Sequence, residues 1–264
     1  MEQIKELRER TGAGMVDCKK ALDESGGNIE KAIEILRKKG IAKAAKRSER
    51  EAGEGIIIVS TNDDKTEAYA LELNSETDFV ARNEKFQELA GKILEIIKNK
   101  KPESGGDLLK AELDGSTVEE SISNLSGVIG EKLALGRFFF VSGQTVAAYS
   151  HLGGKIGVLV ALDQADKNEL ATDIAMHIAA ANPRYLNSEE VPSEELDKEK
   201  EIYKEQLLKE GKPENIIENI MQGKVKKYYS DVCLLDQEYI KDDKKSVKDI
   251  LGGVSILKFV RLSL

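Results

Sequence analysis

The sequence is poor in the residues that mark several common protein classes. It has no tryptophan, only two cysteines and four prolines among 264 residues. Two cysteines cannot form a disulfide framework. The apolar runs are a handful of residues long, well short of the roughly 20 that cross a bilayer. The start of the chain, Met1 to Arg8, is charged where a secretory signal would be apolar. We therefore expect a cytoplasmic protein with no membrane partner.

The charge balance lacks the basic excess of nucleic-acid-binding proteins. There are 40 Lys and Arg against 48 Asp and Glu, which leaves a net charge of −8. Because a primary DNA or RNA binder carries a basic footprint, we expect no direct nucleic-acid partner. The apolar fraction of 40% is too high for wholesale disorder. The length allows one or two domains with cores of their own, plus small appendages.

Motifs for chemical catalysis are also missing. The sequence has no Gly-x-Ser-x-Gly, His-Glu-x-x-His or Gly-x-Gly-x-x-Gly motif. Its two histidines, His151 and His177, have no cysteine or carboxylate around them at zinc-ligand spacing. We interpret His177, within a predicted helix, as structural, whereas His151 at a hairpin tip fits either a structural or a contact role. Cys18 lies on an apolar helix face. We therefore expect no enzyme, no catalytic residue, no metal site and no cofactor.

The first segment, residues 1–40, is predicted to be a module of three short helices. Thr11-Gly12-Ala13-Gly14 ends the first helix, and Asn28 is a good N-cap for the third, which we expect Gly40 to end. A bundle this small has a marginal core and is expected to lean on the rest of the chain. Met15, beside the turn, fits either that core or an adaptable contact surface, and its pattern favours the core.

The rest of the chain is predicted to be an α+β fold of two related subdomains. After residues 41–54, a solvated linker with some helical tendency, residues 55–141 and 142–264 each show a hairpin pattern followed by an amphipathic helix. We expect each subdomain to be an antiparallel sheet covered by helices. Inserted in the second, two apolar stripes over about 193–228 predict a coiled helical hairpin that protrudes from the body.

Two expectations concern the burial of strands. Along the predicted strand that contains Tyr69–Leu73, apolar residues alternate with smaller or polar ones, which predicts one buried face. The predicted strand over 137–141 contains three consecutive phenylalanines, Phe138 to Phe140. We expect that strand to lie deep between the two sheets.

The segment Asn74–Arg82 joins a buried strand to a helix, yet it carries two acids beside a Phe-Val pair. In one interpretation, Thr77 or Asp78 caps a helical turn while Phe79 packs in the core. In the other, Phe79 is an exposed aromatic wedge with a carboxylate beside it. The pattern alone favours the first interpretation and does not exclude the second.

Four motifs resemble the signatures of the bacterial translation elongation factor Ts family. In chain order they are Thr11-Gly-Ala-Gly-Met-Val-Asp-Cys-Lys-Lys-Ala-Leu22 after Ile4–Arg10, then Thr77–Ala81, then His151 with Gly154–Val160, and last Ile174–Ala179. Each motif alone is modest support, but the four occur in family order across most of the chain.

The resemblance implies a guanine-nucleotide exchange factor that binds elongation factor Tu and promotes GDP release. Such a factor acts on the GDP and magnesium ion that its partner holds. The family resemblance implies that four residues disturb the magnesium site: Thr77, Asp78, Phe79 and Val80. It implies partner contacts for Arg10, Gly12, Met15, Val16, Lys19, His151 and Gly154.

The sequence departs from the family pattern in two places. Met15-Val16 stands where the family usually has Met-Met. The chain stops at Leu264, where many members continue into a C-terminal helical module, so we expect the contacts of that module to be missing. Both a one-to-one and a two-to-two complex remain open.

A second hypothesis is a non-catalytic adaptor or scaffold protein without exchange activity. The three-helix module is similar to ubiquitin-associated domains, and it fits this hypothesis as well as it fits exchange. The segment Thr77–Val80 distinguishes the two hypotheses, because a scaffold has no need of it.

Overall fold

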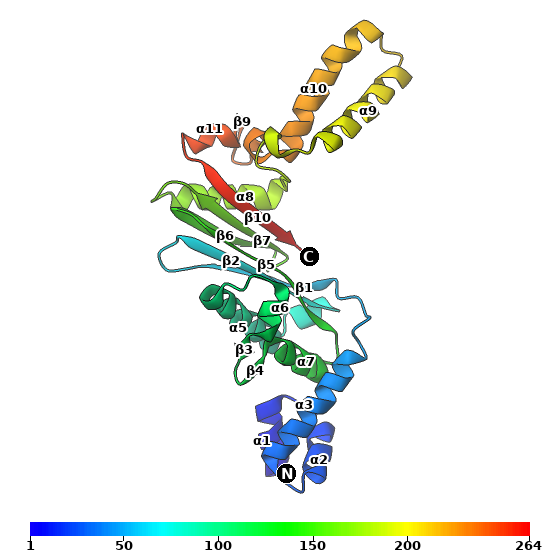
Figure 1. The fold of residues 1–264 in the computed structure, drawn as a ribbon, viewed down its shortest axis with the longest axis vertical. Helices are drawn as coiled ribbons and strands as arrows, with labels where there is room; N and C mark the ends of the chain where they lie inside the picture. The colour runs from blue at the N-terminus through cyan, green and yellow to red at the C-terminus, as the bar shows by residue number, and fades with distance from the viewer.

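The computed structural model describes the backbone of residues 1–264 and all side chains except those at positions 41, 43, 45, 214 and 215. The molecule is elongated, with a three-helix unit at one end, two sheets and their helices in the middle, and a helical hairpin at the other end (Figure 1). The fold is therefore a mixture of α and β elements, as the sequence predicts. No helix formed by the described residues has the length and apolar character needed to cross a membrane.

The N-terminal unit has its own small core. Its helices are α1 (Glu2–Thr11), α2 (Met15–Glu24) and α3 (Ile29–Ala45). Leu7, Cys18 and Ala32 are fully buried among them. The side chain of Asn28 caps α3 by accepting a hydrogen bond from the amide of Lys31 at 3.0 Å. Both the three helices and the cap agree with the sequence-based expectation.

The third helix does not end at Gly40, contrary to expectation. It continues to Ala45, so the first part of the predicted linker is helical. Gly40 lies where α3 crosses α7 (Val118–Ile129), and its backbone approaches Gly127 closely. The glycine therefore serves a close helix contact and does not act as a helix terminator.

The first sheet has three antiparallel strands in the order β1–β2–β5. These are β1 (Glu54–Thr61), β2 (Glu67–Ser75) and β5 (Leu133–Ser142). The helices beside it are α4 (Asp78–Ala81), α5 (Glu84–Lys100), α6 (Gly105–Lys110) and α7, and α6 is joined to α7 by a short ribbon of β3 (Glu112–Leu113) and β4 (Ser116–Thr117). One face of the sheet packs on these helices, with Tyr69, Leu71 and Phe86 in the shared core.

The second sheet repeats this plan in the order β10–β7–β6. Its strands are β6 (Thr145–His151), β7 (Ile156–Leu162) and β10 (Ile256–Ser263). Helices α8 (Asn168–Ala181) and α11 (Val247–Leu251) cover one face, and a small ribbon of β8 (Glu238–Tyr239) and β9 (Asp242–Ser246) precedes α11. Both predicted sheet-plus-helix units are thus present.

The two sheets pack face to face, which makes four layers in the order helices, sheet, sheet, helices. Ala68, Ala70 and Leu159 are fully buried between the sheets. Strand β2 is therefore buried on both faces, whereas the sequence pattern predicted one buried face. In the sequence pattern, small residues such as Ala68 indicate neither a buried nor an exposed face. Their small size nevertheless lets the two sheets approach closely.

The expectation that Phe138–Phe140 lies deep between the sheets is wrong. Strand β5 pairs only with β2 and is the edge strand of its sheet. Phe138 packs on the helical side of the first sheet, but Phe139 and Phe140 are partly exposed. The order of strands in a sheet depends on long-range pairing, so the local run of aromatics could not show that the strand lies at an edge.

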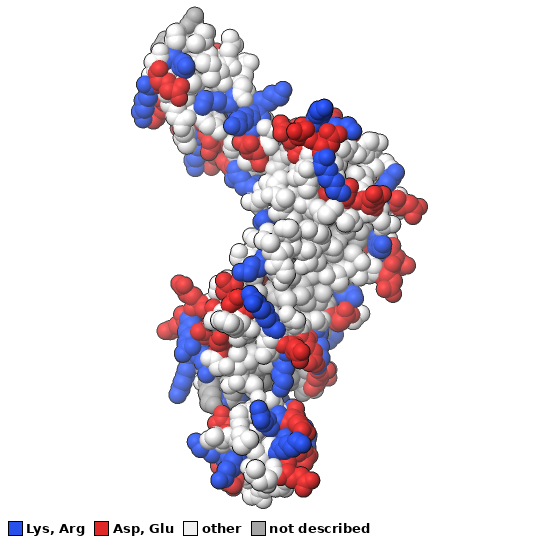
Figure 2. All heavy atoms as spheres, turned by 180° about the vertical axis from the view of Figure 1, so that it is seen from behind, with Lys and Arg blue, Asp and Glu red and all other residues white. Residues whose placement is uncertain are grey.

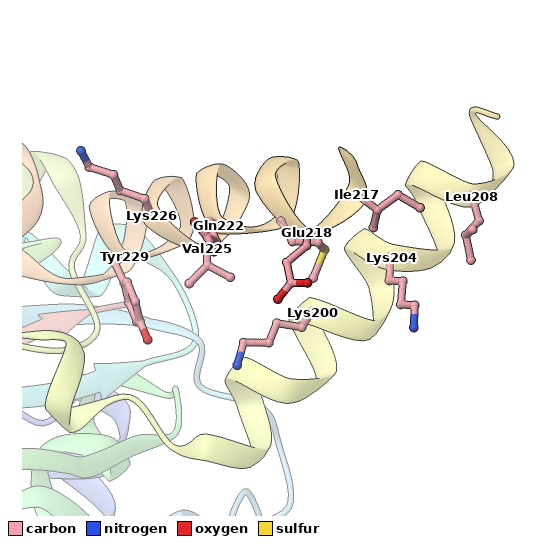
Figure 3. Close-up of a pocket in the computed structure, with 10 residues that line it drawn as sticks. Lys200, Lys204, Leu208, Ile217, Glu218, Gln222, Val225, Lys226 and Tyr229 are labelled. Carbon is pink, nitrogen blue, oxygen red and sulfur yellow. The ribbon is translucent and has the colours of Figure 1, made fainter. Parts of the chain in front are cut away.

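The predicted helical hairpin is formed by α9 (Ser193–Lys209) and α10 (Glu214–Val232), and it projects from the body (Figure 1). Short 3₁₀ turns precede α9 (Ser188–Glu190) and follow α10 (Leu234–Asp236). A groove of about 980 Å³ separates the two helices, and residues of both helices face it (Figure 3). At the base of the hairpin, the Glu195 carboxylate contacts Arg184 at 2.6 Å and accepts a hydrogen bond from Tyr185 at 2.6 Å. Charged side chains gather on the hairpin and on the N-terminal unit, whereas the middle of the face in Figure 2 has few.

Candidate partner-binding surface

The segment after β2 exposes its aromatic side chain. Phe79 is 80% exposed, whereas Val80 beside it is buried in the first core. The chain leaves β2 at Ser75 and makes the single turn α4, and that turn directs Val80 inward. The interpretation that places Phe79 in the core is therefore wrong, and the exposure that the other interpretation requires is confirmed. Asp78, next to Phe79, pairs with Arg82 at 2.8 Å.

A network of hydrogen bonds from the connection between α7 and β5, and from Arg50 ahead of β1, holds this segment. The Glu131 carboxylate accepts one hydrogen bond from the Thr77 amide at 3.0 Å and one from the Thr77 hydroxyl at 2.7 Å. The Glu76 carboxylate accepts a hydrogen bond from the Lys132 amide at 2.5 Å and one from Arg50 at 3.2 Å. The Lys132 amide, followed by Arg50, lowers the pKa of the Glu76 carboxyl. Phe79 thus projects from a well-held backbone.

The outer face of α2 presents a second group of predicted contact residues. Met15 and Val16 are 55% and 66% exposed, and Lys19 one turn later is exposed as well. The opposite face of α2, which includes Cys18 and Ala21, is buried in the module core. Met15 therefore lies on a surface, contrary to the expectation from its pattern. Spacing of three and four residues fits either face of a short helix, so the pattern could not decide.

Arg10 and Gly12 lie at the end of α1, close to α2. Arg10 is exposed and pairs with Glu30 at 2.8 Å. Gly12 has φ +69°, and an added Cβ would clash with the Lys85 ammonium group at the start of α5. The backbone of Gly12 therefore turns the chain and brings the N-terminal module against the core.

The hairpin turn between β6 and β7 forms a third group. His151 is half-buried, and its Nδ1 lies 3.0 Å from the Tyr149 hydroxyl. Leu152, which the sequence analysis did not single out, is 66% exposed with φ +51°. The sequence signal that could have identified Leu152 as a candidate contact residue was an apolar residue at a predicted hairpin tip.

Gly154, at the end of the same turn, is buried. Its φ is +91°, and an added Cβ would lie 2.8 Å from Ile56 Cγ1. Its carbonyl accepts a hydrogen bond from the Ile57 amide at 2.7 Å. Gly154 thus joins the turn to β1, and Leu152 is the large apolar side chain that the turn exposes.

Two of the three groups lie at the same end of the sheets. Glu54 at the start of β1 pairs in register with Ser75, which lies two residues before Thr77. The Glu54 carboxylate also lies 3.4 Å from the Lys155 ammonium in the β6–β7 turn. The N-terminal module is placed separately, through the contact of Gly12 with α5 and of α3 with α7. The candidate contact residues thus lie on three separate elements of the fold.

The remaining chemistry-bearing residues are structural. His177 is buried, and its Nε2 lies 2.9 Å from Gln237 Oε1. Since Nδ1 accepts a hydrogen bond from the Ile240 amide at 3.4 Å, Nε2 carries the proton, and burial lowers the pKa of the imidazole. Cys18 and Cys233 are buried thiols. Within the described part of the chain, no three His, Cys, Asp or Glu side chains are grouped to hold a metal ion.

Comparisons with known proteins identify the family to which the chain is similar. Residues 76–264 match the family described as Elongation factor TS. A relative from a Nitratiruptor species, named Elongation factor Ts, is 50% identical over 279 aligned residues, which cover 99% of this chain and 92% of the relative. The family match covers well over half of the chain, and the identity of 50% extends over nearly all of it. Together they establish the family. The chain belongs to the elongation factor Ts family of translation elongation factors.

Proposed function

We propose that this protein is a guanine-nucleotide exchange factor that binds elongation factor Tu in its GDP form and promotes release of GDP. The observation that carries the proposal is the position of Phe79. It is 80% exposed, and the backbone just ahead of it is held by hydrogen bonds with Glu131 and Lys132. An aromatic side chain presented in this way contributes to the free energy of binding when it enters a pocket on a partner.

Phe79 acts as a wedge in this proposal. A GTPase holds GDP largely through its phosphates and a magnesium ion, which requires near-ideal octahedral geometry. Insertion of an aromatic ring beside that site moves the supporting elements, and small displacements weaken both the ion and the nucleotide. Asp78 can assist, because its partner Arg82 is exposed and a surface ion pair contributes only about 0–1 kcal/mol. The Asp78 carboxylate is therefore free to reorient toward the ion or its water ligands.

The other two groups supply binding, separate from the wedge. Met15 and Val16 offer an apolar patch on α2, and Leu152 offers another at the tip of the β6–β7 turn. His151 beside Leu152 adds a polar contact. In this proposal, substitutions in these groups weaken association, whereas substitution of Phe79 lowers the rate of GDP release from the complex that forms.

Reversibility follows from thermodynamic linkage. If the factor lowers the affinity of its partner for a guanine nucleotide, that nucleotide lowers the affinity of the partner for the factor by an equal ratio. GTP entry can therefore expel the factor. No general acid, nucleophile or metal ion of its own is needed for this cycle.

The test is release of a fluorescent GDP analogue from elongation factor Tu, with and without this protein, across magnesium concentrations. We expect acceleration that fades as magnesium rises. Burial of a Phe side chain contributes about 1.5–3 kcal/mol, so Phe79→Ala should lower the acceleration about tenfold or more. Its stability should stay within about 0.5 kcal/mol of wild type, because an exposed side chain is removed.

Ile240→Ala is the matched control, since Ile240 is an exposed apolar side chain on the ribbon beside α11. With this variant, GDP should leave elongation factor Tu as fast as it does with the wild-type factor. Binding without any acceleration by the wild-type protein would favour the adaptor or scaffold hypothesis. A Phe79→Ala variant that unfolds far more easily, yet retains full exchange activity, would show that the wedge assignment is wrong.

A further inference from the structure

Two carboxylates link residues 76–80, the segment that carries Phe79, to the connection between α7 and β5 in a reciprocal arrangement. Glu131 accepts hydrogen bonds from the amide and hydroxyl of Thr77 at 3.0 and 2.7 Å. Glu76, one residue earlier, accepts a hydrogen bond from the amide of Lys132 at 2.5 Å. The neighbours Thr77 and Glu76 thus pair with the neighbours Glu131 and Lys132, which lie 54 and 56 residues away in the sequence. We name this arrangement the Glu76–Glu131 clamp.

The clamp replaces an ordinary helix cap. Thr77 is the N-cap residue of α4, but its side chain makes no capping hydrogen bond within that turn. Its hydroxyl donates to Glu131, and its carbonyl accepts a hydrogen bond from the Ser75 hydroxyl at 2.9 Å. An uncapped four-residue helix has little stability of its own, because so short a helix is below the length that sustains itself. The direction in which α4 presents Phe79 therefore depends on contacts outside α4.

The segment that carries Glu131 is itself held firmly. Gly130 ends α7 with φ +93°, and the Ser126 hydroxyl donates a hydrogen bond to the Glu131 carbonyl at 2.6 Å. The Ser126 carbonyl accepts a hydrogen bond from Arg47 at 3.2 Å. Leu133, which soon follows, is buried in the first core. The Glu131 carboxylate is thus presented from a backbone that is fixed on both sides.

We infer that Glu131 is a positioning residue for exchange, which orients Phe79 by holding Thr77 at its amide and its hydroxyl. This inference rests on the proposed function. In this inference Glu131 acts through Thr77, from which each of its two carboxylate oxygens accepts a hydrogen bond. Loss of Glu131 leaves Phe79 present and exposed, but lets α4 sample orientations in which the ring misses its pocket.

The test uses Glu131→Ala and Glu131→Gln in the full-length protein, with Glu119→Ala as the control. Glu119 is an exposed carboxylate in the first turn of α7, the helix that precedes Glu131, and its removal changes the net charge equally. GDP release is measured over a range of factor concentrations, and hydrogen exchange is measured at the Thr77 amide. We expect Glu131→Ala to lower the maximal acceleration about tenfold, with little change in the concentration that gives half the effect.

Hydrogen exchange at the Thr77 amide should rise about tenfold or more in Glu131→Ala, because the amide loses its acceptor. Glu131→Gln keeps one carbonyl acceptor and should lie between Ala and wild type in both measurements. Glu119→Ala should match wild type. If Glu131→Ala unfolds too easily to assay, Thr77→Val replaces it in the same measurements. That variant removes the hydroxyl that donates to Glu131 and keeps the shape of the side chain and the amide.

A double-mutant cycle separates positioning from direct contact. If Glu131 acts through Phe79, Glu131→Ala should have no further effect on GDP release in a Phe79→Ala background. An equal effect in both backgrounds, or lost acceleration with unchanged Thr77 exchange, would overturn the inference. If the wild-type protein fails to accelerate GDP release, the proposed function fails, and exchange at the Thr77 amide still reports whether Glu131 holds the segment.

Discussion

Substitution of Gly127 by alanine tests how the N-terminal module is attached to the core. Gly127 lies in α7 where α3 crosses it. An ideal Cβ at this position would lie 2.5 Å from Gly40 Cα, 2.9 Å from Gly40 O and 3.0 Å from Gly40 C. All three are backbone atoms of α3, so no side chain can rotate to make room. The two helices would have to separate.

The expected loss of stability follows from two opposing terms. Carbon atoms in contact lie about 3.5–4.0 Å apart, so relief of the clash requires a shift of roughly 1 Å. Overpacking of this kind costs about 1–3 kcal/mol. Alanine in place of glycine within a helix stabilises by about 0.5–1 kcal/mol. Gly127→Ala should therefore destabilise the protein by about 0–2.5 kcal/mol, which is about 1–3 kcal/mol less stable than a glycine-to-alanine change without the clash.

Gly91→Ala is a matched control, because Gly91 lies within α5 and an added Cβ would meet no atom within 4 Å. It gains the same helix preference without the clash and should be stabilised by about 0.5–1 kcal/mol. The difference between the two variants isolates the cost of overpacking.

Equilibrium urea unfolding, followed by circular dichroism, measures both variants. Hydrogen exchange in α1–α3 then shows whether the loss is confined to the N-terminal module. A Gly127→Ala protein that is as stable as Gly91→Ala would refute the argument, since it would show that the helices have room at the crossing.

Two further predictions concern titratable groups in the second half of the chain. Burial lowers the pKa of His177, so below about pH 6.5 the unfolded chain binds more protons than the native state, and the free energy of unfolding should fall as pH decreases. Urea titrations on either side of that pH should show a smaller fall for His177→Gln; an equal fall would contradict the assignment. Hydrogen bonds from Tyr185 and Tyr228, followed by Arg184, lower the pKa of Glu195. This stabilisation is present above the unfolded pKa of about 4.3 and is lost as pH falls through the lower native value. Glu195→Gln should loosen the base of the helical hairpin at neutral pH, and limited trypsin digestion should cut α9 and α10 faster; unchanged cleavage would show that the Glu195 contacts do not hold the hairpin.

The elements that the sequence predicted well are those whose signals are local. The apolar stripe of α5 and the Asn28 cap of α3 each lie within a few residues of the structure they specify. Such patterns require no knowledge of distant chain segments.

The errors arise where distant segments decide. Gly40 has the local signature of a helix end, but its role is set by Gly127, which lies 87 residues later in the numbering (127 − 40). The run that contains Phe139 has the signature of a core strand, but pairing with β2 alone puts it at an edge. Neither partner is visible in the local sequence.

The candidate site shows the same limit. A Phe-Val pair at the start of a single helical turn allows either residue to point inward, and Val80 is the one that does. The contact that distinguishes the two possibilities, Thr77 to Glu131, spans 54 residues. The resemblance to a family identified the segment, but the clamp that holds it could be found only in the structure.

The way in which the N-terminal module is attached has a consequence for how its position can change. The residues buried in its core, from Leu7 to Ala32, contact one another and form a cluster separate from the core of the first sheet. Its attachment depends instead on the crossing of α3 and α7 at Gly40 and Gly127, on the Arg37–Glu120 ion pair and the hydrogen bond from Arg47 to the Ser126 carbonyl, and on contacts at Gly12. Because folding of the module and its placement rest on different contacts, a substitution at the crossing can move the Met15 surface relative to Phe79 while both stay folded. The distance between the Met15 surface and Phe79 is therefore set by this attachment, and it can be altered without loss of either surface.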